Sequence, residues 1–214
     1  MNLDDNVDEH AQRRARSGDS ATRAALLDAA RRCVAERGLA GATSREITAA
    51  AGANLAAITY WFGSKDDLVA EALFEELDAR VAPALAELEG DGPPAARMAA
   101  AVQRLMVELE RSRDQLGAHV EALVLATRDP VYGRRARALH RRITRRLAAL
   151  IVDLQGAGSV PPWVDPVAMS SLILATAHGI VLQALLDPRG PRPPEMAGQF
   201  ASLLLASAVP DERP

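Results

Sequence analysis

The fold is decided by the stretch from Thr43 to Leu68, which reads TSREITAAAGANLAAITYWFGSKDDL. Thr43 with Glu46 three residues later forms a capping box, the usual start of a helix, and Asn54 is a favoured N-cap for the next one. Gly52 follows three alanines and is the residue best suited to a left-handed helix exit. The stretch therefore predicts two short helices, 44–51 and 55–61, joined by a tight turn as a helix-turn-helix.

A longer helix is expected on each side of this motif. Before it, apolar residues recur at helical spacing from Ala21 onward, and Gly38 supplies a helix stop. After it, Ser64 with Asp67 forms a weaker capping box for a helix that runs toward Pro83. The residues expected on the buried face of the first helix are Leu26, Leu27, Ala30, Cys33 and Val34.

The rest of the chain also favours helices. They are expected near 94–113, 115–127, 130–155, 165–187 and 194–208. Asp129 and Asp165 each precede a proline, which places an N-cap ahead of a first-turn proline. No segment alternates with the period of two that a half-buried strand requires. The sequence predicts an all-α protein.

Composition limits the class of protein. The chain has 214 residues, one cysteine, 49% hydrophobic residues and only 3% aromatic residues, so it can bury a core that must be aliphatic. One cysteine cannot form an intramolecular disulfide and no charged and apolar leader precedes the fold, so we expect a reducing cytoplasm. Residues 11–65 hold nine basic and four acidic side chains, although the whole chain has a net charge of -3. This local excess of basic side chains could contact phosphate groups.

The segment from Pro166 to Leu186 contains no charged residue and is long enough to span a bilayer. Polar residues within it and the absence of flanking aromatic belts favour another interpretation. We expect a helix buried on several sides, inside a bundle or between subunits, and no membrane association.

The segment of residues 20–70 resembles the TetR family of bacterial transcriptional regulators. Two positions depart from the family pattern: Ala56 stands where a glycine is common, and Thr59 stands where a tyrosine is usual and is followed by Tyr60. The resemblance implies a homodimeric, sequence-specific DNA-binding regulator, most often a repressor, with the second helix of the motif in the major groove. The residues in the family register are Gly38, Thr43, Ile47, Ala50, Ala51, Gly52, Phe62, Ser64, Lys65 and Leu68.

The second helix of the motif is the expected DNA-reading element. Small residues at Ala56 and Ala57 would let the backbone approach DNA closely, and Trp61 either contacts DNA or packs on the first helix. The resemblance implies phosphate contacts from Thr43 and Lys65, and phosphate or base-edge contacts from Thr59 and Tyr60. The expected DNA-contacting residues are Thr43, Ser44, Asn54, Ala56, Ala57, Thr59, Tyr60, Trp61 and Lys65, with Arg13, Arg14 and Arg16 in an N-terminal arm.

Three expected domains follow: a disordered arm over 1–19, a three-helix DNA-binding domain over 20–66, and a helical bundle for effector binding and dimerisation over 67–214. The dimer would bind a roughly palindromic operator. The expected interface is a seam of small residues in the long apolar helix together with the last helix, comprising Ala168, Ser171, Ala175, Gly179, Leu182, Phe200 and Leu204.

A small apolar or amphipathic effector is expected to release the repressor, because Tyr132 and Trp163 are the only aromatic residues between Phe74 and Phe200, and a pocket among the central helices must be lined mainly by Leu, Val, Ala and Met. Met98, Met106 and Met169 are expected to line its pocket, with polar anchoring from His119, Glu121, Thr176, His178 or Gln183. Lone histidines such as His119 and His178 are otherwise typical of hydrogen-bonded core positions.

Two other classes of protein are considered. A helical interaction or sensor protein could use the helix-turn-helix only for packing. An enzyme is disfavoured, since no phosphate-binding loop, nucleophile motif or metal-ligand spacing occurs, and we expect no cofactor and no metal. Seven arginines between 134 and 146 could form a second nucleic-acid patch, but apolar residues at helical spacing there favour the solvated face of an amphipathic helix.

Overall fold

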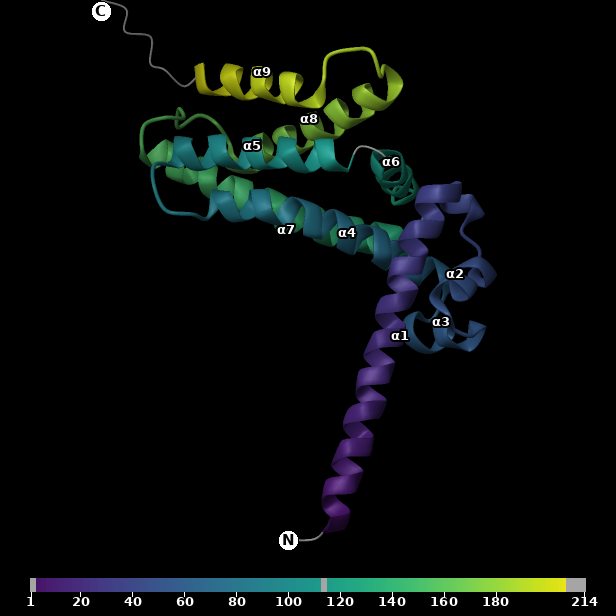
Figure 1. Cartoon of the computed structure of the whole chain (residues 1–214). Helices are drawn as coiled ribbons and strands as arrows, with labels where there is room; N and C mark the ends of the chain where they lie inside the picture. Colours follow the sequence, from purple (N-terminus) through teal and green to yellow (C-terminus); the bar gives the residue numbers. More distant parts are fainter. Residues whose placement is uncertain (1–2, 113–114, 207–214) are drawn as a thin grey trace, which may run out of the picture. The chain divides into compact units, whose positions relative to one another are not determined.

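The computed structural model of the chain describes the backbone of residues 3–112 and 115–206, and the side chains of residues 19–112 and 115–203. Within these ranges every regular element is a helix, which confirms the predicted all-α class (Figure 1). The helices are α1 (Leu3–Gly41), α2 (Ser44–Ala51), α3 (Leu55–Phe62), α4 (Lys65–Leu88), α5 (Pro94–Arg111), α6 (Leu116–Leu125), α7 (Pro130–Gly156), α8 (Pro166–Leu186) and α9 (Pro193–Ala206).

Two compact units divide the chain. The first, here called the head unit, comprises residues 1–75 and 121–133; the second, the body unit, comprises residues 76–120 and 134–214. The long helix α4 and the helices α6 and α7 contribute residues to both units. Each unit is described separately below.

The head unit is built on a small aliphatic core. Helix α2 packs against α1 and α3, and α3 also contacts α1. Leu26 of α1, Ile47 of α2 and Leu68 of α4 are completely buried, and Ile58 of α3 is nearly so. Burying side chains of this size contributes roughly 1.5–3 kcal/mol each. This core fixes the short helices α2 and α3 on the longer α1.

Helix α1 begins earlier than the sequence predicts. Its backbone is helical from Leu3, in the segment where a disordered arm is expected over residues 1–19. The prediction of a disordered arm rested on the scarcity of apolar residues in this segment. Alanine, glutamine, glutamate and arginine have high helix propensity, so they can extend a helix that packing has nucleated further along the chain. The expected stop at Gly38 is present as a break with φ 70° and ψ 174°, after which the helix continues to Gly41.

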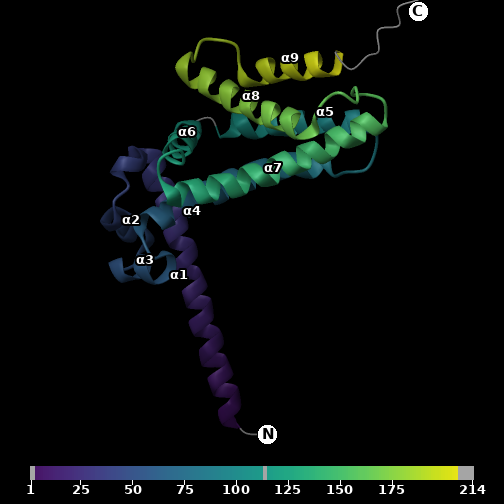
Figure 2. The same cartoon turned by 180° about the vertical axis from the view of Figure 1, so that it is seen from behind.

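The body unit places α9 against both α5 and α8, and these three helices lie together in Figures 1 and 2. On α7, five apolar residues at helical spacing are buried, and four of its seven arginines are exposed while three are half-buried, in line with an amphipathic helix. The buried residues are Leu139, Ile143, Leu147, Leu150 and Leu154. Two of the arginines, Arg142 and Arg146, form ion pairs with Asp78 of α4 and with Glu89 just beyond it. These pairs tie α7 to the body-unit half of α4, which continues through Pro83 to Leu88.

Candidate nucleic-acid interface and effector cavity

Side-chain caps fix the start of α2. The Oγ1 of Thr43 accepts a hydrogen bond from the backbone N–H of Glu46 at 3.3 Å. The Glu46 carboxylate accepts from the backbone N–H and the hydroxyl of Thr43 at 3.2 and 3.0 Å, which completes the predicted capping box. At the other end Gly52 takes the predicted left-handed conformation, with φ 64° and ψ 29°. The turn between α2 and α3 is therefore set by local chemistry.

The outer face of α3 is exposed and polar at its centre. Asn54 caps the helix by accepting from the N–H of Ala57 at 2.9 Å, and Ile58 anchors the inner face. Thr59 is exposed, and 73% of Tyr60 is exposed. Trp61 is half-buried and meets the Tyr60 ring edge to face, with centroids 4.9 Å apart. Of the remaining predicted DNA-contacting residues, Thr43 and Ala56 are exposed, and Ser44, Ala57 and Lys65 are half-buried.

A second set of contacts holds α3 in place. The guanidinium of Arg23 on α1 lies 5.3 Å from the centroid of the Phe62 ring at the end of α3, a cation–π distance. Arg23 also forms an ion pair with Glu71 of α4. One arginine thus contacts three helices of the head unit and helps to position α3.

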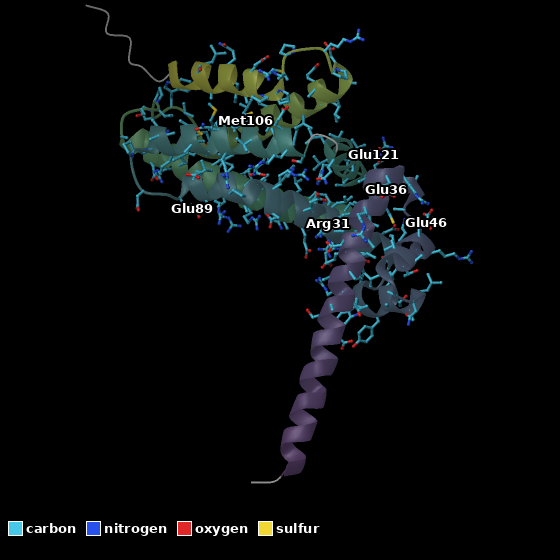
Figure 3. The ribbon with its side chains drawn as sticks, in the orientation of Figure 1. Arg31, Glu36, Glu46, Glu89, Met106 and Glu121 are labelled. Atoms are coloured by element: carbon cyan, nitrogen blue, oxygen red, sulfur yellow. The ribbon has the colours of Figure 1, made fainter. Side chains whose placement is uncertain are left out.

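Of the six basic side chains over 19–65 that the structure describes, four form ion pairs with acidic residues, including Arg23 with Glu71. Arg37 pairs with Glu46, Arg31 pairs with Asp28 at 2.7 Å, and Lys65 lies 3.0 Å from the Asp66 carboxylate. Figure 3 labels Arg31 on α1 and Glu46 on α2.

Arg45 differs from these four paired basic residues. It is exposed on the first turn of α2 and pairs with no acidic side chain in the part of the chain that the structure describes. Sequence reasoning missed it as a site residue. The signal was present, because no acidic residue lies three or four positions from it in either direction. The predicted arm residues Arg13, Arg14 and Arg16 lie outside the described side chains.

The body unit contains a cavity of about 180 Å³. It lies among α5, the end of α7, the segment 160–164, α8 and α9. Four predicted pocket residues line it: Met98, Met106, Met169 and Thr176. Figure 3 labels Met106 on α5. Trp163 and Phe200 add aromatic rings to the wall. Phe200 is also a predicted interface residue, and that prediction stays open.

The other four predicted polar anchors do not line the cavity. His119 is buried, with its Nδ1 2.7 Å from the carbonyl oxygen of Gln115 and 3.3 Å from Nη1 of Arg80. Glu121 is exposed in the head unit, and Gln183 is exposed on α8. His178 is stacked on another histidine, as described next. None of these four side chains faces the cavity.

A stacked histidine pair joins α7 to α8. The rings of His140 and His178 have centroids 5.1 Å apart and planes inclined by 26°. Burial lowers the pKa of both imidazoles below the ordinary 6.5, and the proximity of His140 lowers the pKa of His178 further. The pair is therefore favoured in its neutral form.

Helix α8 has two apolar faces. Met169, Ile173 and Thr176 line the cavity. All five predicted seam residues are exposed on the single chain: Ala168, Ser171, Ala175, Gly179 and Leu182. By length and composition alone, Pro166–Leu186 could also cross a membrane, but core helices of soluble proteins pass the same test. The side chain of Leu204 lies outside the described residues.

Comparisons with known proteins agree with this architecture. Residues 26–72 match the family model described as bacterial regulatory proteins, tetR family. Residues 94–209 match the model described as BetI-type transcriptional repressor, C-terminal. No curated protein matches the chain.

Several solved structures share the fold. A TetR transcription regulator from Haloarcula marismortui is 24% identical, with a TM-score of 0.75 over 88% of this chain and 98% of that one. The fatty acid degradation regulator FadR from Bacillus halodurans is 18% identical, with a TM-score of 0.70 over 85% and 96%. The multidrug binding protein EbrR, solved with imidazole, is 28% identical, with a TM-score of 0.63 over 90% and 98%.

The family matches cover the motif helices and most of the body unit. Because both models describe transcriptional regulators, they favour a DNA-binding helix-turn-helix over one used only for packing. The chain belongs to the TetR family of DNA-binding transcriptional regulators, a non-enzymatic family, and carries a C-terminal domain of the BetI-type repressor class.

Proposed function

We propose that the protein is a cytoplasmic repressor that binds a roughly palindromic operator as a homodimer and leaves it when a small apolar or amphipathic effector binds. The observation that carries the proposal is the exposed outer face of α3, capped by Asn54 and fixed to the head core by Ile58. DNA binding is assigned to residues 20–66, and effector binding and dimerisation to 67–214.

In this proposal α3 enters the major groove. Thr59 and Tyr60 reach base edges or phosphates, and the small side chains of Ala56 and Ala57 allow close approach of the backbone. Thr43, Ser44 and Lys65 stand at helix starts, where backbone N–H groups favour phosphate. Arg45 joins this set because its charge is available for a phosphate.

Selection of bound duplexes from random DNA, followed by fluorescence anisotropy on the selected site, tests DNA reading. Tyr60→Ala should weaken binding by about 5- to 150-fold, the range of one good base contact. The same change at Arg141, an exposed residue of α7, should have little effect. Full affinity of the Tyr60→Ala variant together with loss of binding in the Arg141→Ala variant would show that α3 is not the DNA-binding face.

We propose that the dimer forms through the outer face of α8. The small residues Ala175 and Gly179 permit close helix approach, and apolar side chains around them, including Leu172 and Leu182, are exposed on the single chain. The α9 residue Leu203 is 60% exposed and would extend the apolar surface. A two-fold contact through α8 and α9 would set two recognition helices about 34–36 Å apart, the spacing of successive major grooves.

The effector is proposed to bind in the body-unit cavity, and the similarity to a multidrug-binding protein supports a small-molecule ligand. Ile151 and Leu154 of α7 line the cavity, and Arg142 and Arg146 connect α7 to α4. Helix α4 begins at Lys65 beside the DNA-binding motif, so it is the proposed route of coupling.

Thermodynamic reciprocity gives a direct test of the coupling. If a ligand weakens operator binding by some factor, the operator must weaken ligand binding by the same factor. Titration of a ligand that binds the protein, with and without the selected duplex, should give two different affinities. Equal affinities would refute release by the effector, because a ligand that binds the DNA-bound and free states with equal affinity does not change the balance between them.

A further inference from the structure

The chemistry of the cavity narrows the class of its ligand. We propose that it selects an uncharged lipophile, about the size of one aromatic ring with a two-carbon arm, whose only polar group is a hydrogen-bond donor to Thr176. This inference rests on the proposed effector role of the cavity and specifies the ligand more closely.

The described residues that line the cavity include no acidic, basic or amide side chain. Thr176 contributes the only side-chain hydroxyl, and the remainder of the wall is aliphatic, aromatic or thioether. A carboxylate or an ammonium that entered would lose its hydration and meet no counter-charge. The wall therefore disfavours ionic ligands of either sign.

Apart from the indole N–H of Trp163 at the exposed edge, the Thr176 hydroxyl is the only polar side-chain group among the described lining residues, and its existing hydrogen bond limits what it can offer a ligand. The Thr176 hydroxyl donates to the carbonyl oxygen of Leu172, one turn earlier on α8, at 2.9 Å. A hydroxyl has one proton, so only its oxygen lone pairs remain for a ligand. Thr176 can then accept a hydrogen bond from an alcohol but cannot donate one to a ketone or an ester.

The backbone of the adjoining segment is also engaged. Gln155 donates from Nε2 to the carbonyl oxygens of Pro161 and Val164, at 3.2 and 2.8 Å. Both residues line the cavity, as does Trp163, which is nevertheless 81% exposed. Trp163 therefore lies where the wall meets solvent. These two carbonyl oxygens thus already accept hydrogen bonds from within the chain, and this side of the cavity adds mainly apolar surface.

The volume sets the size of the ligand. Apolar cavities of about 150 Å³ hold benzene, so about 180 Å³ suits a ring with a short arm. Met98, Met106 and Met169 are flexible side chains that can adjust the wall to the ligand shape.

Four probes that share a ring and two carbons test the charge selection: 2-phenylethanol, ethylbenzene, phenylacetate and 2-phenylethylammonium at pH 7. Binding to the full chain is followed by calorimetry and, in a Trp61→Phe variant, by the fluorescence of Trp163, then the only tryptophan. We expect 2-phenylethanol to bind best, ethylbenzene to follow, and each ion to bind at least about 100-fold more weakly than the alcohol.

Thr176→Val should weaken the binding of 2-phenylethanol by about 2- to 10-fold and leave the binding of ethylbenzene unchanged, because the substitution removes only the hydrogen-bond acceptor. The matched control is Thr144→Val on α7, where the hydroxyl makes the same type of bond to the carbonyl of His140 at 2.9 Å but does not line the cavity. This control should change neither affinity.

Three results would overturn the inference: an ion that binds as tightly as the alcohol, no binding of either neutral probe, or equal loss of alcohol binding in Thr176→Val and Thr144→Val. The operator duplex separates this inference from the proposed function. If a neutral probe binds but leaves operator affinity unchanged, ligand selection stands and release by this ligand class fails. If an ion binds and releases the duplex, effector control stands and ligand selection fails.

Discussion

The charge on Arg45 gives the sharpest test of the DNA-binding face. It is an exposed arginine on α2 beside the recognition helix, whereas Arg37 and Arg31 already pair with acids. Arg45→Ala should change the free energy of unfolding by no more than about 0.5 kcal/mol, because it removes an exposed side chain. Any large effect on DNA binding would then come from a lost contact.

The expected size of that effect follows from counterion release. Each phosphate contact adds about 0.9 to the slope of log affinity against log salt. A dimer that loses one contact in each head should lose about 1.8 from the slope. Between 50 and 200 mM salt, where concentration rises fourfold, the affinity of the variant should fall about tenfold less than that of the unmodified protein.

Fluorescence anisotropy on the selected duplex, repeated across that salt range, measures both slopes. Arg141→Ala is the matched control, since Arg141 is also exposed on a helix and pairs with no acidic side chain among the described residues. The control should keep the original slope. A slope unchanged in Arg45→Ala but reduced in Arg141→Ala would show that the arginines of α7, and not α2, meet the phosphates.

Three further predictions concern assembly, pH and helix capping. Ala175→Asp places a charge on the exposed face of α8 and should convert a dimer to a folded monomer in sedimentation, with helical circular dichroism retained; an undisturbed dimer would exclude this face. Because the pKa of His140 and of His178 is lowered in the folded protein, stability should be fully present above the unfolded value near 6.5 and fall as the pH drops toward the folded values. His178→Phe should reduce that loss in thermal melts compared between pH 7 and 5. Thr43→Ala removes the N-cap bond to Glu46 and should cost about 1 kcal/mol, or about 2–4 °C in melting temperature; an unchanged melting temperature would contradict the capping argument.

The helix ends of the head unit could be predicted from the sequence because they depend on local residues. Thr43, Asn54 and Ser64 each cap a helix in the structure, and Gly52 takes the left-handed conformation that the turn requires. Such signals involve residues within four positions of one another, so they need no knowledge of the tertiary fold. The start of α1 was missed for the complementary reason. Low apolar content argues against a packed segment, but it does not prevent a backbone from continuing a helix already begun.

The polar anchors of the cavity were not predictable in this way. His119, Glu121, His178 and Gln183 share residue type and neighbourhood with a plausible binding site, yet tertiary contacts give them other environments. A lone polar residue on an apolar helix has no periodic signal that assigns it to one face. The three methionines predicted for the pocket do line this cavity, as expected where an aliphatic protein with few aromatics offers few other side chains to shape one, and their role in effector binding stays a prediction.

Helix α8 shows why its composition alone was ambiguous. A membrane span, a core helix and an interface helix all require apolar residues around most of the circumference. Thr176 lines the cavity, while its neighbour Ala175 is exposed on the single chain. Adjacent residues on a helix point about 100° apart, so a ligand that displaces one side of α8 also moves the other. In a homodimer built on that outer face, occupancy of the cavity would alter the contact between subunits directly. If the proposed dimer forms there, the absence of charge along α8 serves two requirements of one helix, an apolar cavity wall and an apolar interface.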